Sequence, residues 1–375
     1  MASLFDGLPS AVRLIDAGAG GGALTSNLVR RACKPNSGVQ SIHVTAYELD
    51  TLILPALRET LADCEALCRT CGIAFAASVH PTDFIQEMAG KLSDDLFSGV
   101  PPSFNVAIAN PPYKKINTNS PERLALRSVG LETSNLYAGF VGLLARLLEA
   151  RGQLVVITPR SFCNGPYFRP FREDLLSMME LRRLHVFESR EAAFRNDGVL
   201  QENIIFHAIK SGTQTPTVTV SASSGEAGGS IMVKGFPFAE IVHANDPEKF
   251  IHIPADHGHA SAKARLSELP DTLASLGLTV STGRVVDFRL KNALRPQPVP
   301  GTVPLLYPCH FNGGTIHWPK LDARKPNAIL DNETTRPWLV PTGLYLLTKR
   351  FTSKEERRRP VAAPYERQNE MLQVG

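Results

Sequence analysis

The stretch LIDAGAGGGALT, residues 14–25, decides the fold. Its first residues complete an apolar run from Val12 to Ala17, which predicts a buried β-strand. Glycines then crowd the next positions, and glycine permits positive φ angles and lets a ligand approach the backbone closely. Residues Ala23–Ala32 are typical of a helix. A strand, a glycine turn and a helix in this order predict a ligand-binding loop at the carboxyl end of a strand.

The same alternation of short apolar runs and helical stretches continues to about residue 210. Strands are predicted at Ile42–Glu48, Ile73–Val79, Phe104–Ala109, Leu154–Thr158, His185–Glu188 and Glu202–Ile209, and helices at Leu52–Cys71, Leu136–Ala150 and Phe168–Leu181. Strands that alternate with helices of this length predict an α/β fold with a doubly wound, mostly parallel sheet. Ligands on such sheets bind at the carboxyl ends of the strands.

The C-terminal part of the chain differs in composition and in charge. A chain of 375 residues usually forms two domains. Beyond about residue 254 the sequence is rich in Pro, Gly and Arg, so we expect a soft boundary near residues 250–260 and an irregular, loop-rich second domain. From Ser281 to Gly375 there are 15 Lys and Arg against 8 Asp and Glu. A net charge of +7 there favours a polyanionic partner, although a solvated basic surface is the alternative.

Carboxylates follow the first three strands, and they indicate the kind of cofactor. Asp16 lies just before the glycine turn, where a carboxylate repels a pyrophosphate but accepts hydrogen bonds from an ammonium group. This favours S-adenosylmethionine over NAD, even though residues 18–23 also fit the dinucleotide pattern GxGxxA. Glu48 can accept both ribose hydroxyls, and Asp83 can accept an adenine amino group. Each carboxylate alone could equally be a helix N-cap or a solvated loop residue.

The most specific motif is Asn110-Pro111-Pro112-Tyr113, directly after the apolar run 106–109. The exocyclic amino group of a purine is a poor nucleophile because its lone pair is delocalised into the ring. Two acceptors for its hydrogens, the Asn110 side-chain oxygen and the Pro111 carbonyl, would favour a more tetrahedral nitrogen. Pro112 stiffens the turn, and the Tyr113 ring offers a face for a flipped-out base.

The chain resembles the S-adenosylmethionine-dependent DNA N6-adenine methyltransferases of type II restriction–modification systems, through Asp16–Gly20 and the motif at 110–113. The order of these motifs resembles the γ class, and residues 158–168 resemble its PstI/BsuBI-type branch, with an Eco57I-like methylase domain. The resemblance implies a Rossmann-like catalytic domain at 1–250 and a DNA target-recognition domain at 251–375. It also implies that both ends are incomplete, because family members extend further.

The resemblance further implies roles for single residues. Gly18 and Gly20 would pass under the methionine part of the cofactor, with Asp16 near its amino end, Glu48 at the ribose and Asp83 at the adenine; Asn110 would border both substrates. Phe168 stands where family members carry a second aromatic contact to the flipped base. A core position in the helix that follows is its alternative. Double-stranded DNA would be the partner, and a cognate restriction endonuclease would act on the same site.

Several alternatives remain open at this stage. The motif at 110–113 also serves enzymes that methylate RNA or protein glutamine. A nicotinamide-dependent oxidoreductase and a non-catalytic DNA-binding remnant are further readings. The sequence shows no signal peptide and no run of 18 apolar residues, so we expect a cytoplasmic protein that does not engage a membrane.

Two groups of potential metal ligands are best explained without a metal. Cys64, Cys68 and Cys71 have the spacing of the iron–sulfur motif of radical S-adenosylmethionine enzymes. However, they share the apolar face of a predicted helix, so we expect core thiols. His257 and His259 lack companions at convincing ligand spacing. We therefore expect no metal site.

Overall fold

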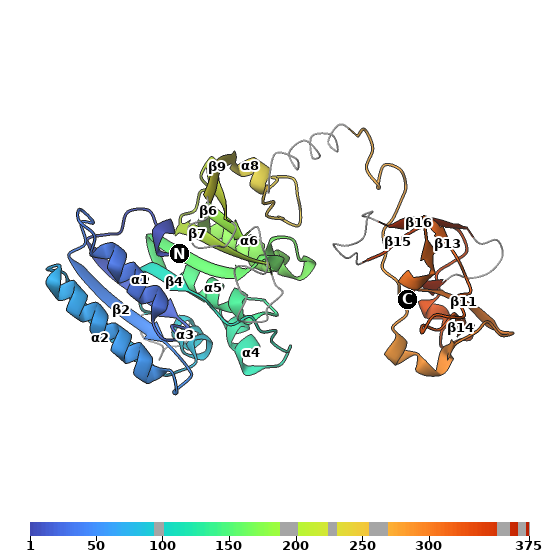
Figure 1. Cartoon of the computed structure of the whole chain (residues 1–375), viewed down its shortest axis with the longest axis horizontal. Coiled ribbons are helices and arrows are strands. Elements are labelled where there is room, and N and C mark those ends of the chain that lie inside the picture. The colour runs from blue at the N-terminus through green and yellow to red at the C-terminus, as the bar shows by residue number, and fades with distance from the viewer. Residues whose placement is uncertain are drawn as a thin grey trace. The chain divides into compact units, whose positions relative to one another are not determined.

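The computed structural model describes residues 1–93, 101–187, 202–223, 231–254, 269–350, 361–366 and 373–374. The chain forms two compact units, Met1–Arg265 and Leu266–Gly375 (Figure 1). The division falls just after the soft boundary at residues 250–260 that the composition indicates, and after the limit at residue 250 that the resemblance implies. Ile251 and Ile253 explain the difference, because both side chains still pack in the core of the first unit.

The first unit is built on one nine-stranded sheet with the order β3-β2-β1-β4-β5-β7-β6-β8-β9. Its strands are β1 Ala11–Ala17, β2 Ser41–Tyr47, β3 Ala74–His80, β4 Phe104–Ala109, β5 Leu148–Pro159, β6 Met179–Phe187, β7 Asn203–Lys210, β8 Thr217–Ser223 and β9 Ile231–Pro237. The strands from β3 to β5 are parallel, and β7 inserts antiparallel between β5 and β6. The predicted mostly parallel, doubly wound sheet is confirmed.

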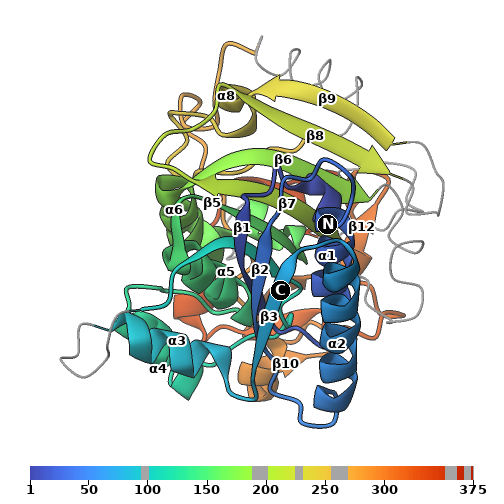
Figure 2. The same cartoon turned by 90° about the vertical axis from the view of Figure 1, so that its left-hand side faces the viewer.

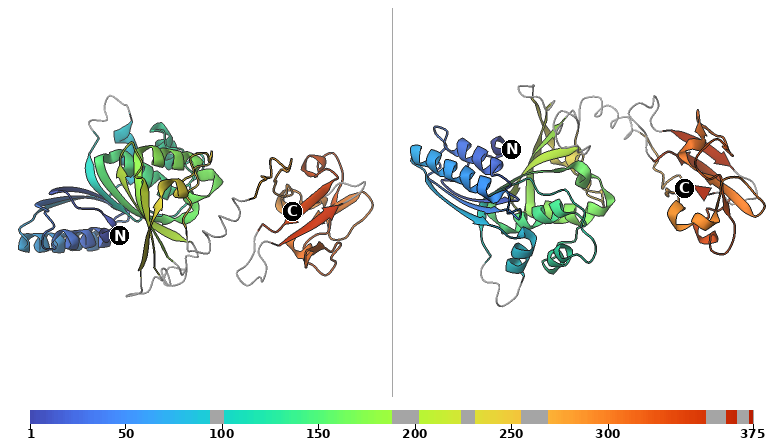
Figure 3. Two further views of the ribbon diagram at one scale, coloured as in Figure 1. Left: turned by 90° about the horizontal axis from the view of Figure 1, so that it is seen from above. Right: turned by 60° about the horizontal axis from the view of Figure 1, so that its bottom comes forward.

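Helices cover both faces of this sheet. They are α1 Ala23–Ala32, α2 Leu54–Thr70, α3 Phe84–Leu92, α4 Pro121–Ser128, α5 Leu136–Leu147, α6 Arg169–Met178 and the short α8 Phe238–Ile241. One face packs against α1 and α2, which lie side by side, through residues such as Leu14 and Leu57 (Figures 2 and 3). The opposite face packs against α3 to α6 through residues such as Ile15 and Leu144. Successive residues of β1 thus point to opposite cores, as a buried parallel strand requires.

Two predicted helix ends are wrong. The helix predicted to reach Ala150 ends at Leu147, because Leu148 begins β5 and pairs with Phe104. Arg151, at φ 67°, and Gly152 form an irregularity within the strand and not a helix cap. Likewise α6 ends at Met178 and the next residues form β6, which is longer than the strand predicted from His185. In both places an apolar run crosses directly from helix to strand, so hydrophobicity marks no boundary.

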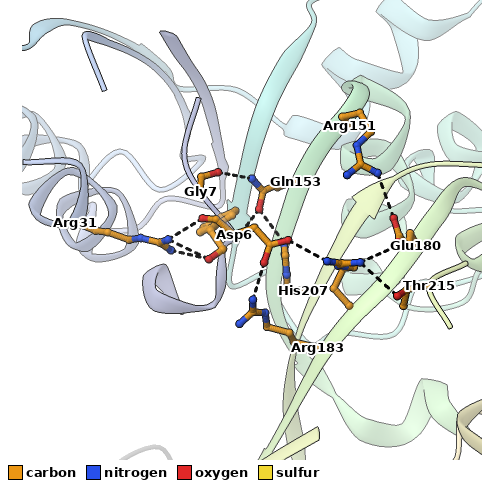
Figure 4. A network of polar contacts seen from close by, with 11 residues as sticks. Asp6, Gly7, Arg31, Arg151, Gln153, Glu180, Arg183, His207 and Thr215 are labelled. Carbon is orange, nitrogen blue, oxygen red and sulfur yellow. Dashed lines mark hydrogen bonds and ion pairs between the residues drawn. The ribbon is translucent and has the colours of Figure 1, made fainter. Parts of the chain in front are cut away.

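The residues before β1 are anchored on the α1 face of the sheet by buried and half-buried polar contacts (Figure 4). The Asp6 carboxylate pairs with Arg183 at 2.6 Å, and Arg31 donates to the Asp6 carbonyl at 2.7 Å. The Asp6 N–H donates to the Gln153 side-chain oxygen, which also contacts His207 Nε2 at 2.9 Å. Burial lowers the pKa of His207 to about 4, so this imidazole is neutral at pH 7. These contacts fix the entry of the chain into β1.

The second unit has a small core of its own around Leu305 and Ile329. Its strands are β10 Leu294–Arg295, β11 Thr302–Leu306, β12 Phe311–Asn312, β13 Thr315–Ile316, β14 Ala328–Leu330, β15 Leu344–Thr348, β16 Ala362–Glu366 and β17 Gln373–Val374. They form a four-stranded sheet, β10-β14-β11-β17, and two separate two-stranded sheets. Short 3-10 turns connect them, and the described residues of this unit contain no α-helix.

Candidate functional site

The register of the sheet brings the predicted site residues to one edge. Asp16 of β1 pairs with Ala46 of β2 on one side and with Ile108 of β4 on the other. Glu48 and Asn110 each lie two residues beyond these partners, so all three residues follow adjacent carboxyl ends. Asp83 follows β3, the next strand outward. The prediction that these residues share one edge of the sheet agrees with the observed register.

The glycine turn after β1 is held by the end of β2. The backbone N–H groups of Gly18 and Ala19 both donate to the Tyr47 carbonyl at 2.9 Å. Gly18 has φ 75° and Gly20 has φ 54°, a region in which a side chain is strained. A Cβ atom on Gly18 would lie 3.9 Å from the Asn110 carbonyl oxygen and 3.8 Å from the Phe140 ring. The glycine turn and the motif after β4 are therefore in direct proximity.

Asp16 is a fully buried carboxyl group with one free oxygen. Its Oδ2 accepts a hydrogen bond of 2.6 Å from the Thr25 hydroxyl, in the first turn of α1. Its Oδ1 is buried and has no hydrogen-bond partner. Burial raises the pKa of Asp16 to about 6, the contacts from Thr25 oppose that rise, and the charge of Glu48 adds to it. A buried oxygen without a donor is costly, and a cationic ligand would satisfy it.

Glu48 and Asp83 are already engaged with backbone groups. Glu48 accepts hydrogen bonds from the N–H groups of Gly20 and Asp50, both at 2.8 Å, so it ties the glycine turn to the end of β2. Asp83 is the N-cap of α3 and accepts from the Gln86 N–H at 2.9 Å. This is the N-cap role that the sequence left open for Asp83. A carboxylate has about four acceptor positions, so both side chains keep capacity for a ligand.

The motif Asn110–Tyr113 follows the last residue of β4, and the first residue of the motif is exposed. Asn110 and Pro112 are exposed, whereas Pro111 is buried and anchors the turn. The Tyr113 hydroxyl lies 3.0 Å from the Asn110 side-chain oxygen and 3.4 Å from the Ile157 carbonyl at the end of β5. Sequence analysis assigned no role to this hydroxyl. Here it connects the catalytic candidate to the neighbouring strand.

Aromatic rings gather behind this motif. The Tyr113 ring meets the Tyr137 ring edge-on, with centroids 6.3 Å apart, and Tyr137 packs against Phe168 at 5.7 Å. The Tyr137 hydroxyl also lies 3.2 Å from the Ser161 hydroxyl. Phe168 is only 8% exposed, so it packs in the core here. Its contact with a flipped base stays a prediction.

Sequence reasoning missed two residues of this site. Thr25 fits a generic helix start, and only the fold shows that its hydroxyl contacts Asp16. Phe140 fits any apolar helix, yet it lies beside Gly18 and packs against Phe84 with ring centroids 4.9 Å apart. Neither contact has a local sequence signal. Thr25 is nine residues from Asp16 and Phe140 is far from Gly18 in the chain, and threonine and phenylalanine are common residues in helices.

Two of the three cysteines expected to be core thiols are buried, and the expectation is wrong for Cys71. Cys64 and Cys68 are buried between α2 and the sheet, while Cys71 is exposed at the helix end. Burial raises the pKa of the Cys68 thiol, which disfavours the thiolate that binds metals. Within the described ranges, no group of three His, Cys, Asp or Glu residues could hold a metal ion. His257 and His259 lie outside the described residues.

The fold and the site together define a Rossmann-like methyltransferase domain. Residues 76–194 match the family model described as Eco57I restriction-modification methylase. A crystal structure described as a modification subunit of a type I restriction enzyme from Vibrio vulnificus YJ016 superposes with a TM-score of 0.50 at 13% identity. The superposition covers 69% of this chain and 58% of that one, and it supports the fold alone.

Two curated relatives are similar over nearly the whole chain. The type II methyltransferase M.PstI of Providencia stuartii is 42% identical over 97% of this chain and 71% of its own length. The type II methyltransferase M.BsuBI of Bacillus subtilis is 44% identical over 96% of this chain and 71% of its own length. The chain therefore belongs to the family of type II methyltransferases that contains M.PstI and M.BsuBI. In the described parts of the chain, no helix is both long and apolar enough to cross a membrane.

Proposed function

We propose that this protein transfers the methyl group of S-adenosylmethionine to N6 of a flipped-out adenine in duplex DNA, as the modification enzyme of a restriction–modification system. The observation that carries the proposal is the proximity of two loops. The glycine turn after β1 and the motif Asn110–Tyr113 after β4 approach each other at Gly18. A methyl donor and a flipped base held by these loops would share one edge of the sheet.

The residues around the glycine turn fit the cofactor. The free Oδ1 of Asp16 is a buried acceptor, and the ammonium group of a methionine moiety is a donor that can satisfy it. Gly18 and Gly20 leave the backbone open beside this acceptor. Glu48 retains acceptor capacity for ribose hydroxyls and Asp83 for an adenine amino group. When bound, S-adenosylmethionine supplies a methyl group activated by its sulfonium sulfur.

The chain itself contributes hydrogen-bond acceptors and a stacking surface. The Asn110 side-chain oxygen and the Pro111 carbonyl would accept the two hydrogens of the adenine amino group. Both acceptors would favour the pyramidal nitrogen, whose lone pair would displace the sulfonium sulfur from the methyl carbon. The methyl–sulfur bond electrons would stay on sulfur as S-adenosylhomocysteine leaves, and the excess proton on nitrogen would pass to water. Tyr113 offers a half-buried ring for stacking. The reaction needs no nucleophilic side chain and no metal ion.

We further propose that the second unit, Leu266–Gly375, recognises the DNA target. The net charge of +7 over residues 281–375 matches a polyanion. A cognate restriction endonuclease would act on the same sequence without stable binding to this chain. A protein with this role is expected in the cytoplasm, where the DNA is.

The test of substrate class is a methyl-transfer assay with labelled S-adenosylmethionine and three acceptors: plasmid DNA, tRNA and total protein. We expect label in DNA only, and loss of that label with Asn110→Ala. Asn117→Ala is the matched control, because Asn117 is an exposed asparagine in the same loop outside the motif. Label in tRNA or protein would support the alternative substrates. DNA binding without any label would support the non-catalytic remnant.

A further inference from the structure

Thr25 contacts Asp16, but the proposed function gives Thr25 no role. Both side chains are fully buried, and the Thr25 hydroxyl lies 2.6 Å from Asp16 Oδ2. The hydroxyl of Thr25, in the first turn of α1, is therefore the group that hydrogen-bonds this carboxylate.

The two oxygens of the Asp16 carboxyl group differ in their hydrogen bonding. Asp16 Oδ1 is buried without a hydrogen-bond partner. Because Thr25 engages only Oδ2, it fixes the rotation of the carboxyl group and leaves Oδ1 available. Without that anchor, the carboxyl group could rotate toward the free N–H groups of the helix start.

We infer that Thr25 is a positioning residue for cofactor binding: its hydroxyl holds Asp16 with one oxygen directed to the ammonium group of S-adenosylmethionine. The inference rests on the proposed function, because it needs the cofactor to bind at the glycine turn. It adds a residue that neither contacts the methyl group nor belongs to the glycine turn itself.

Electrostatics support this role for the hydroxyl. Asp16 is desolvated, and the charged group that faces it from the end of β2 is the carboxylate Glu48, which disfavours ionisation. Hydrogen bonding from Thr25 is the contact that favours the ionised form. An ionised Asp16 is the form that attracts an ammonium group. Thr25 therefore favours both the ionisation of Asp16 and the orientation of its carboxylate.

The test compares Thr25→Val, which removes the hydroxyl at nearly constant shape, with Thr25→Ser, which retains it. Thr45→Val is the matched control, because Thr45 lies on β2 opposite Ile15 and its hydroxyl makes no hydrogen bond to Asp16. Calorimetry at pH 7.5 measures S-adenosylmethionine affinity. Carboxyl NMR of the protein labelled with ¹³C-aspartate measures the pKa of Asp16 without cofactor.

We expect Thr25→Val to weaken cofactor binding about tenfold to a hundredfold, in line with the loss of a hydrogen bond to a charged group. The pKa of Asp16 should rise by about one unit or more in the same variant. In Thr25→Ser, the dissociation constant of the cofactor and the acid dissociation constant of Asp16 should both stay within about threefold of wild type. Thr45→Val should change neither constant.

Two outcomes would overturn the inference while the proposed function stands. One is Thr25→Val protein with wild-type affinity. The other is Thr25→Ser protein as impaired as Thr25→Val, which would show that the methyl group, and hence packing, matters instead. Wild-type protein that binds no S-adenosylmethionine would overturn the proposed function, and the inference with it.

Discussion

Replacement of Arg172 tests how the loop 160–168, next to the motif Asn110–Tyr113, is held. Arg172 lies on α6 and is fully buried. Its guanidinium donates to the carbonyls of Phe162, Gly165 and Glu248 at 2.8, 2.7 and 2.9 Å. It also lies 3.6 Å from the Glu248 carboxylate. These contacts join the loop 160–168 to residues far along the chain.

Arg172→Met removes these donors and leaves buried carbonyls without partners. A buried acceptor that loses its donor typically costs about 1–3 kcal/mol in the free energy of unfolding, whereas the Glu248 carboxylate is 38% exposed and stays solvated. Arg169→Met is the comparison variant, because Arg169 lies one turn earlier, half exposed, and pairs with Glu173 and more distantly with Glu248 without any contact to a buried carbonyl. Exposed ion pairs of this kind contribute little to stability.

Urea unfolding followed by far-ultraviolet circular dichroism reports the first unit, since the described α-helices belong to it. Both tryptophans of the chain, Trp318 and Trp338, lie in the second unit, so their fluorescence is an internal control. We expect Arg172→Met to shift the helical transition strongly and the tryptophan transition little. Equal shifts for Arg172→Met and Arg169→Met would refute the reasoning.

Three further predictions concern the site. Asn110→Ala should lower turnover at least about a hundredfold, comparable to the loss of one oxyanion-hole donor, while S-adenosylmethionine affinity changes little; single-turnover kinetics and calorimetry check this. Tyr113→Ala should weaken capture of the flipped base, read by 2-aminopurine fluorescence, and Tyr113→Phe should lower turnover several-fold because the hydroxyl contacts Asn110. Cofactor affinity should fall about tenfold from pH 7 to pH 5, as Asp16 becomes protonated through its pKa of about 6, and the midpoint should be absent in Asp16→Asn.

Local patterns predicted the part of the fold that holds the site. The apolar run before Gly18 and the run before Asn110 each mark a buried strand, and a parallel sheet places both ends at one edge. The antiparallel insertion of β7 between β5 and β6 has no such signal. Strand order is a property of tertiary packing, and alternation of strands and helices does not encode it.

Candidate site residues could be predicted from the sequence where the residue type is unusual for its position and has polar groups that can bind a ligand. Asp16 and Asn110 stand out because a carboxylate or an amide is unusual at the end of an apolar strand. The Thr25 hydroxyl and the Phe140 ring do not, since a threonine and a phenylalanine fit many helices equally well. Phe168 is an intermediate case: the sequence offered both a contact to the base and a core position, and here it is buried and packs against Tyr137.

The most direct test of the central claim is to identify the methylated base. The full chain is incubated with duplex DNA and S-adenosylmethionine that carries a deuterated methyl group, and the DNA is digested to nucleosides for mass spectrometry. We predict deuterated N6-methyldeoxyadenosine, and none with Asn110→Ala. Deuterium in methylcytosine alone, or in no nucleoside at all while the cofactor binds, would contradict the account.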